Sequence, residues 1–133
     1  PDRAAERLLL AGGDRRDMAA TLPALLAEGE LAALQQQVLA VHAADPLLNY
    51  VQDLIAATRS GQWFVQGLSP RAGIALVRAA KAQALICGRD YVAPDDVQAI
   101  LAQTIAHRLV PVGSAGRGAV AQVQAMVDAV PLP

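Results

Sequence analysis

Apolar residues recur at helical spacing along most of the chain. From Glu30 to His42 they return every three or four residues, which places them on one stripe of an amphipathic helix. The same spacing predicts helices from Asp45 to about Arg59 and from Pro70 to Cys87. The side chains expected to be buried in the first two helices are Leu31, Leu34, Val38 and Val41, then Leu47, Val51, Leu54 and Ile55.

Shorter or weaker patterns predict three further helices. One runs from Arg3 to Leu10, a second begins at Pro94, and a third covers AVAQVQAMVDAV at residues 119–130. The segment from Asp14 to Gly29 has no sustained period and is expected to be a loop, and Arg89 to Val92 is expected to be an extended link. We therefore predict an all-α fold: a compact helical bundle of about five to six helices, with a short extended link between the last long helices.

The length of 133 residues suits one domain that buries roughly two-thirds of its extended surface. We expect residues 1–112 to form this domain. Residues 113–133 are expected to form a C-terminal tail, whose short helix packs on the same domain. Because the chain does not begin with methionine, we expect it to be a piece of a longer protein.

Composition and charge narrow the class of protein. Hydrophobic residues make up 54% of the chain but aromatic residues only 3%, so the core is mainly alanine, leucine and valine, which favours closely packed helices. Eleven basic and twelve acidic residues give a net charge of −1, without the basic excess of a duplex-binding domain. Nucleic acid is therefore not the leading partner. No stretch approaches the roughly 20 apolar residues of a membrane span.

The candidate reactive residues are few. The single cysteine, Cys87, excludes an internal disulfide, and no cysteines or histidines are spaced as zinc ligands, so no metal site is expected. This cysteine usage and the lack of a signal peptide favour a cytoplasmic location. We expect Cys87 to be a buried, unreactive thiol, Asp95 and Asp96 to stabilise a helix start, and His107 to lie at a helix end.

The chain shows no catalytic machinery of its own for nucleotide hydrolysis. Such an enzyme needs a glycine-rich phosphate loop with its lysine, and an acidic residue at a strand end for magnesium, and neither pattern is present. The glycines of GSAGRG, residues 113–118, follow no predicted strand. We therefore expect no enzyme activity, catalytic residue or bound cofactor from this chain alone.

The start of the helix at Pro70 carries the strongest functional signal. Ser69 is suited to accept a hydrogen bond from a first-turn N–H, and Pro70 stands where its missing N–H costs nothing. Arg71 follows at a helix end that itself attracts anions. Arg78 shares a row with Arg71, and Lys81 lies one turn beyond. Two interpretations stay open: a solvated charged face, or a site that reads an anion such as a polyphosphate.

A family resemblance is carried by two segments. Residues 67–98 read GLSPRAGIALVRAAKAQALICGRDYVAPDDVQ, and residues 106–110 read AHRLV. They resemble the C-terminal helical lid of MoxR-type AAA+ ATPases, whose usual pattern is close to GASPRA, a long helix of Ala, Leu and Arg, then GRDYVTPDDV. The resemblance extends upstream through PDRAAER, DRR and VHAADPLLNYVQDLIAATR, and covers most of the chain to about Pro111. Two departures are Leu68, where a small residue is usual, and Ala93, where threonine is the common helix cap.

The resemblance implies a function for the whole protein. In the family, the arginine of SPRA is the sensor-2 residue, which reaches from the lid to the γ-phosphate of ATP held by the preceding core domain. That position is Arg71 here, and Ser69 and Pro70 support the helix start. The resemblance further implies ATP and Mg²⁺ bound mainly by the core, ATP hydrolysis, a homo-hexameric ring, chaperone-like assembly or maturation of protein complexes, and a partner carrying a von Willebrand factor A domain.

Arg78 and Lys81 are expected to form a lid surface or an interface. The alternative to a lid is a stand-alone helical module that binds proteins or DNA through the face of Arg71, Arg78 and Lys81. Tight, salt-dependent DNA binding would favour that alternative.

Overall fold

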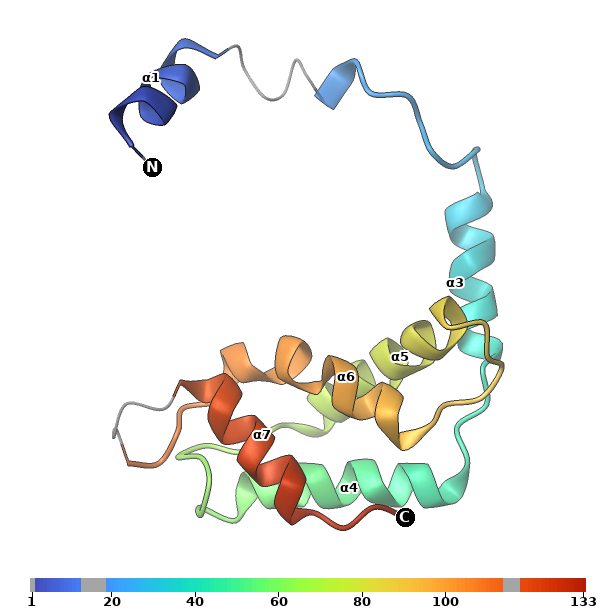
Figure 1. Cartoon of the computed structure of the whole chain (residues 1–133). Helices are drawn as coiled ribbons and strands as arrows, with labels where there is room; N and C mark the ends of the chain where they lie inside the picture. The colour runs from blue at the N-terminus through green and yellow to red at the C-terminus, as the bar shows by residue number, and fades with distance from the viewer. Residues whose placement is uncertain (1, 13–18, 114–117) are drawn as a thin grey trace. The chain divides into compact units, whose positions relative to one another are not determined.

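The computed structural model is helical, without a β-strand, over the residues it describes: 2–12, 19–113 and 118–133 (Figure 1). The helices are α1 (Arg3–Ala11), α3 (Glu30–Ala40), α4 (Asp45–Arg59), α5 (Pro70–Ile86), α6 (Pro94–Ile105), the 3₁₀ helix η1 (Ala106–Arg108) and α7 (Ala119–Ala129). The predicted all-α class is confirmed, and the predicted helix ends agree with these bounds to within two residues. Residues 14–18 of the predicted loop and residues 114–117 of the GSAGRG segment lie outside the described residues.

The chain divides into two compact units, Pro1–Leu31 and Ala32–Pro133. In the first unit, α1 begins after Asp2, whose Oδ1 accepts a hydrogen bond from the Ala5 N–H at 2.8 Å. The second unit contains the main hydrophobic core, and α7, from the segment expected to be a tail, is part of it.

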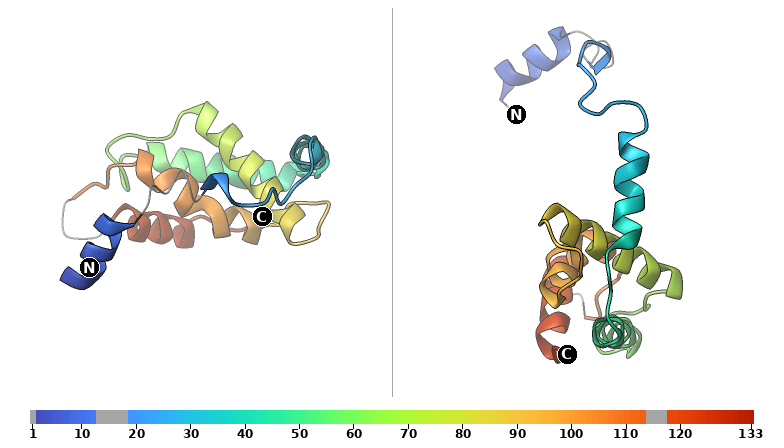
Figure 2. Two further views of the ribbon diagram at one scale, coloured as in Figure 1. Left: turned by 90° about the horizontal axis from the view of Figure 1, so that it is seen from above. Right: turned by 90° about the vertical axis from the view of Figure 1, so that its right-hand side faces the viewer.

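In the second unit, helix α5 packs against both α4 and α6. Helix α7 lies against α4, α6 and η1 (Figure 2). Every fourth residue of α5 is buried, and because most of these residues are alanine, the neighbouring helices can approach closely. The buried row of α5 is Ala72, Leu76, Ala80 and Ala84.

The predicted inward face of α4 is confirmed, and α6 has a similar buried face. Both helices present an apolar stripe to the core, and Ile55 and Ile100 are half-buried at its edge. The buried members of the two stripes are Leu47, Val51 and Leu54 in α4, then Val97, Leu101 and Ile105 in α6. Phe64, in the connection between α4 and α5, is 1% exposed and completes the core.

Two isolated β-bridges join segments that connect the helices. His42 and Tyr91 form a parallel bridge, in which the His42 N–H donates to the Asp90 carbonyl at 2.7 Å. This bridge confirms the predicted extended link after α5. A second, antiparallel bridge joins Phe64 to Pro111. Both connections are therefore held by backbone hydrogen bonds between segments distant in sequence.

The predicted buried stripe of α3 is wrong. Leu31 is 58% and Leu34 is 40% exposed, and α3 has no buried residue. Among the described helices none packs along α3, so its apolar spacing has no partner surface. Val41, just beyond the helix end, is the buried member of the predicted set, and Val38 is half-buried.

In the described part of the chain, every helix is too short or too polar to cross a membrane.

Candidate functional site

The start of α5 has the predicted cap. Ser69 is extended (φ −76°, ψ 159°), and its Oγ accepts from the Ala72 N–H at 3.4 Å. Pro70 occupies the first turn, and Arg71 follows it on the exposed surface. Arg71 makes no hydrogen bond or ion pair with any residue in the described ranges, so its guanidinium donors are available to a ligand.

Two residues at the end of α4 hold the chain immediately before this cap. The Thr58 Oγ1 accepts from the Leu68 N–H at 3.0 Å and donates to the Ile55 carbonyl at 2.6 Å. The Arg59 Nε donates to the Leu68 carbonyl at 2.8 Å. Both backbone groups of Leu68 are thus bound to α4, which fixes where α5 begins and therefore where Arg71 stands.

Gly67 allows this close approach. A Cβ atom on Gly67 would lie 2.4 Å from the Arg59 Cγ and 2.7 Å from the Arg59 Cα, closer than real Cβ contacts. Because one of these atoms is backbone, a larger residue would push the connection away from α4. Sequence reasoning did not assign roles to Thr58, Arg59 or Gly67. The only signal was Gly67, two residues before Ser69, and a glycine there is equally typical of an ordinary turn.

We expect Thr58→Val to lower the free energy of unfolding by about 1–3 kcal/mol, because the buried Leu68 N–H loses its acceptor. Thr58→Ser is the matched control, since it keeps the hydroxyl while removing a methyl group. Urea unfolding measures stability, and amide hydrogen exchange at Leu68 reports the bond itself. Exchange at Leu68 should accelerate in the valine variant and not in the serine variant; equal exchange in both would contradict the role of the hydroxyl.

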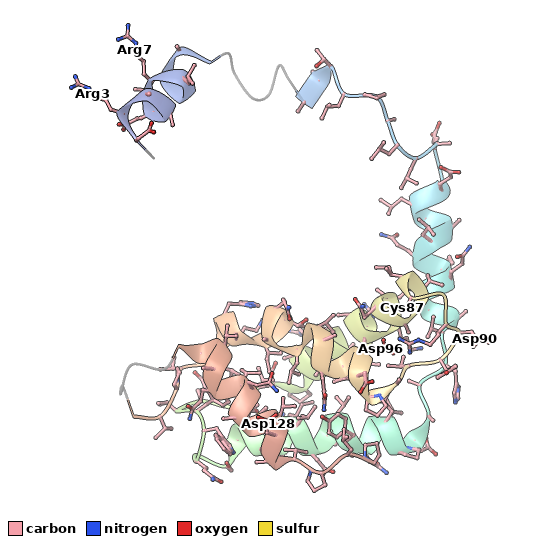
Figure 3. The ribbon with its side chains drawn as sticks, viewed as in Figure 1. Arg3, Arg7, Cys87, Asp90, Asp96 and Asp128 are labelled. Atoms are coloured by element: carbon pink, nitrogen blue, oxygen red, sulfur yellow. The ribbon has the colours of Figure 1, made fainter. Side chains whose placement is uncertain are left out.

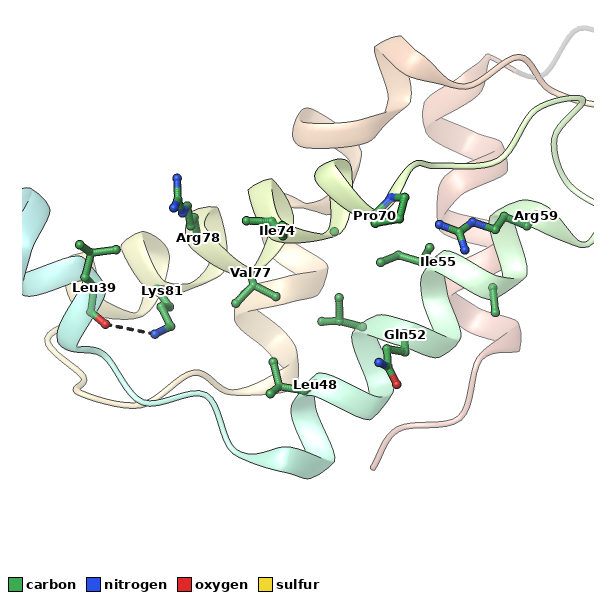
Figure 4. Close-up of a pocket in the computed structure, with 13 residues that line it drawn as sticks. Leu39, Leu48, Gln52, Ile55, Arg59, Pro70, Ile74, Val77, Arg78 and Lys81 are labelled. Atoms are coloured by element: carbon green, nitrogen blue, oxygen red, sulfur yellow. Dashed lines mark hydrogen bonds between the residues drawn. The ribbon is translucent and has the colours of Figure 1, made fainter.

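The predicted row of three cations is divided by the tertiary structure. Arg78 and Lys81 line a groove between α4 and α5, whereas Arg71 is not among the groove's lining residues. The Lys81 Nζ donates to the Leu39 carbonyl at 3.2 Å, near the end of α3 (Figure 4). Lys81 is half-buried, while Arg71 and Arg78 are exposed. The three side chains therefore do not act as one uniform solvated face.

The groove has a volume of about 760 Å³ and a mainly aliphatic lining. In Figure 4, Arg59 and Pro70 lie at one end, and Leu39 and Lys81 lie at the other. The lining residues are Leu39, Leu48, Val51, Gln52, Ile55, Ala56, Arg59, Pro70, Gly73, Ile74, Val77, Arg78 and Lys81.

The start of α6 is organised around a buried carboxylate. Asp96, labelled in Figure 3, is 3% exposed. Its two oxygens accept from both terminal nitrogens of Arg89, with the Nη1–Oδ2 distance at 2.6 Å. The Asp96 Oδ2 also accepts from the Ala93 N–H at 2.8 Å. This bond supports the helix start, where Ala93 has no polar side chain for capping. The predicted helix-start role of Asp96 is confirmed, but its partner Arg89 was missed.

These contacts set the charge states of the pair. The Arg89 guanidinium, with a smaller contribution from the Ala93 N–H, holds the pKa of Asp96 below its ordinary value despite burial. Asp96 in turn raises the pKa of Arg89 above its ordinary value. The Arg89 Cζ also lies 5.8 Å from the centre of the Tyr91 ring. The pair therefore remains ionised at neutral pH and fixes the link between α5 and α6.

The remaining candidates are on the surface. Cys87 was predicted to be buried, and this is wrong: the buried row of α5 ends at Ala84, and Cys87 at the helix end is exposed (Figure 3). His107 lies at a helix end, in η1, and is exposed. No group of three or more His, Cys, Asp or Glu residues in the described ranges could hold a metal ion.

Comparison with known proteins adds the family context. The family described as "AAA lid domain" matches residues 56–129. A protein of Bacillus subtilis named "Uncharacterized protein YeaC" is 39% identical over 89 residues, which cover 67% of this chain and 28% of that protein. "Chaperone MoxR1" of Mycobacterium tuberculosis is 35% identical over 95 residues, which cover 65% of this chain and 25% of that protein.

A solved structure shares the fold. It is that of a protein from Cytophaga hutchinsonii described as a proposed ATPase, with a TM-score of 0.67 and 26% sequence identity, and the match covers 74% of this chain and 33% of that one. The chain thus spans about a quarter to a third of the length of the proteins it matches.

Proposed function

Because the chain belongs to the AAA lid domain family, as a lid of the MoxR type of AAA+ ATPase, we propose that it closes over ATP bound by a core domain elsewhere in the whole protein. In this proposal Arg71 is the sensor that contacts the terminal phosphate of ATP. The observation that supports this role is the position of Arg71: it lies on the first turn of α5, is exposed and is unpaired within the described residues.

The surroundings of Arg71 fit a phosphate contact. Its guanidinium can donate two parallel hydrogen bonds to phosphate oxygens, and the adjacent helix start favours negative charge. A charge-assisted hydrogen bond of this kind contributes roughly 1.5–3 kcal/mol. When bound, ATP supplies the phosphoanhydride that is cleaved, and Mg²⁺ supplies charge neutralisation. The described residues include no cluster for the metal, so we assign both ligands mainly to the core.

The anchoring of Leu68 couples movement of Arg71 to movement of α4. Thr58 and Arg59 bind the residue just before the α5 cap, so movement of Arg71 toward a phosphate carries α4 with α5. The lid therefore moves as a rigid body in response to nucleotide and passes this state to the rest of the protein.

The wider role proposed for the whole protein follows the family. We propose an ATPase that works in the cytoplasm as a homo-hexameric ring, with a chaperone-like role in assembling or maturing protein complexes and a partner carrying a von Willebrand factor A domain. The name of the Mycobacterium tuberculosis relative, "Chaperone MoxR1", supports the chaperone-like role.

The lid proposal is tested by hydrogen exchange on the whole protein. With Mg²⁺ and a non-hydrolysable ATP analogue, we expect slower exchange at residues 69–72, because closure removes the α5 start from water. Residues 119–122 at the start of α7 serve as the internal comparison. Exchange at residues 69–72 that is identical with and without nucleotide would contradict the proposal.

A DNA-binding module is the competing function, and the structure gives it little support. The expected contact row is divided, because Lys81 is half-buried and bonded to the Leu39 carbonyl. We expect no salt-sensitive gel shift of duplex DNA by the isolated chain at physiological salt. Submicromolar binding there would favour the DNA-binding module over the lid.

A further inference from the structure

The geometry points to a second binding surface, beyond the nucleotide role: the groove between α4 and α5 is a docking site for an acidic amphipathic helix of a partner protein. Three properties of the groove support this assignment, namely its aliphatic floor, its length and the sign of its charges. None of them involves Arg71, which lies outside the lining.

The floor of the groove presents aliphatic side chains to solvent. Ile74 is 58% and Leu39 is 52% exposed, and Leu48 is 38% exposed. Val51 is buried and Val77 is half-buried, so they form the base of the same surface. Covering such side chains releases ordered water and favours association with another apolar surface.

The length of the groove fits a short helix. It follows α5 from Pro70 to Lys81, a stretch of twelve residues whose ends lie about 16 Å apart at the helical rise. A partner helix of three turns has this length and would place apolar anchors at positions i, i+3 or i+4, and i+7. The two walls of the groove are themselves helices, α4 and α5, which is the geometry into which a third helix packs (Figure 4).

The charges select an acidic occupant. None of the thirteen lining residues is acidic, whereas Arg59, Arg78 and Lys81 are cationic, in a chain whose net charge is only −1. Within the described ranges, Arg59 and Lys81 each use one donor and keep others for a ligand, because guanidinium has five N–H donors and ammonium three. Carboxylates flanking the partner's apolar stripe therefore complement both ends of the groove.

A second copy of the chain is a poor occupant. The apolar stripes of α4, α5, α6 and α7 are buried in their own core. Helix α3 has exposed leucines but a single carboxylate, Glu30, and α1 carries two arginines against one glutamate. No described helix therefore offers an exposed apolar stripe flanked by acidic residues, so we assign the groove to a helix of a partner protein and not to a second copy.

The experiment uses three labelled synthetic helical peptides that share leucine anchors and differ in having flanking Glu, Gln or Lys residues. Fluorescence anisotropy measures their binding to the 133-residue chain without nucleotide, so failure here leaves the lid proposal untouched. We expect the Glu peptide to bind at least about tenfold more tightly than the Lys peptide, with a preference that falls at high salt. Equal affinities, or no saturable binding up to roughly 1 mM, would overturn the proposal.

Two groove variants and one control variant locate the binding surface. Ile74→Glu should lower the affinity for the Glu peptide at least about tenfold. Val120 is similarly exposed on α7 but lies outside the groove, so Val120→Glu should leave this affinity unchanged. Arg78→Glu should narrow or reverse the preference for Glu over Lys peptides. Circular dichroism verifies that each variant is folded. Binding by Ile74→Glu with unchanged affinity would overturn the assignment.

Two further measurements exclude other occupants. Sedimentation velocity tests for self-association of the chain; a dimer abolished by Ile74→Glu would identify a second copy as the occupant and overturn the proposal. Repeating the titration with the whole protein tests whether its other domains cover the groove. We expect the Glu peptide to bind there as well, and loss of binding would overturn the partner assignment.

Discussion

In the whole protein, Arg71→Ala should lower the turnover number for ATP by roughly ten- to a hundredfold. The expected loss corresponds to removing one charge-assisted contact to the terminal phosphate, worth about 1.5–3 kcal/mol. Arg71→Lys should recover only part of the rate, because an ammonium keeps the charge but cannot donate the paired bonds of a guanidinium. Steady-state ATPase assays at saturating ATP measure the effect.

The same substitution should leave the lid folded. Arg71 is exposed and makes no hydrogen bond or ion pair within the described ranges, so its removal should change the free energy of unfolding by less than about 0.5 kcal/mol. Arg108→Ala, another exposed arginine, in η1, is the control for general loss of positive charge. An unchanged turnover number in Arg71→Ala would contradict the sensor role. Equal losses of turnover in Arg71→Ala and Arg108→Ala would indicate a nonspecific effect of charge.

Asp96→Ala should lower the free energy of unfolding by about 3 kcal/mol. The substitution removes the carboxylate that Arg89 contacts with both terminal nitrogens, and it also leaves the Ala93 N–H without its acceptor. Asp95→Ala is the matched control: the neighbouring acid is exposed, so its removal should cost less than about 1 kcal/mol through the helix dipole alone. Urea unfolding of both variants measures the difference; similar losses would contradict the special role of Asp96.

The stabilisation by Asp96 should depend on pH in a defined direction. Its pKa is lowered in the folded protein, so the contribution is fully present above the ordinary aspartate value of about 3.9 and is lost as pH falls through the folded-state pKa. Arg89 stays charged throughout, because Asp96 raises its pKa. The stability gap between the parent chain and Asp96→Ala should therefore be constant from neutral pH to about pH 5 and shrink in stronger acid. A gap that persists unchanged below the folded-state pKa would contradict this account.

The helix bounds were predictable because their signals are local. Ser69 followed by Pro70, and Pro94 followed by two acids, specify helix starts through groups within one turn of each other. The glycine after Cys87 has a positive φ of 74°, the conformation that its position after a helix predicts. The family resemblance was visible for the same reason, since its motifs are contiguous stretches of chain.

Periodicity failed where it needed a partner surface. The spacing in α3 is that of a buried stripe, yet Leu31 and Leu34 are exposed because none of the described helices packs along them. An apolar stripe indicates which face of a helix would be buried, but it does not show whether another element is present to cover that face. The predicted burial of Cys87 was also wrong, because burial at a helix end depends on how far the neighbouring helices extend.

The sequence alone thus determined the helical class, the helix ends and the presence of an arginine on the first turn of α5. Only the tertiary structure decided what surrounds that turn. Thr58 and Arg59 reach Leu68 across nine or ten residues, and Lys81 reaches Leu39 across forty-two. Capping and periodicity act over a few residues, whereas these contacts depend on the packing of whole helices. The bonding of Leu68 to α4 and the separation of Arg71 from Arg78 and Lys81 could therefore be seen only in the folded chain.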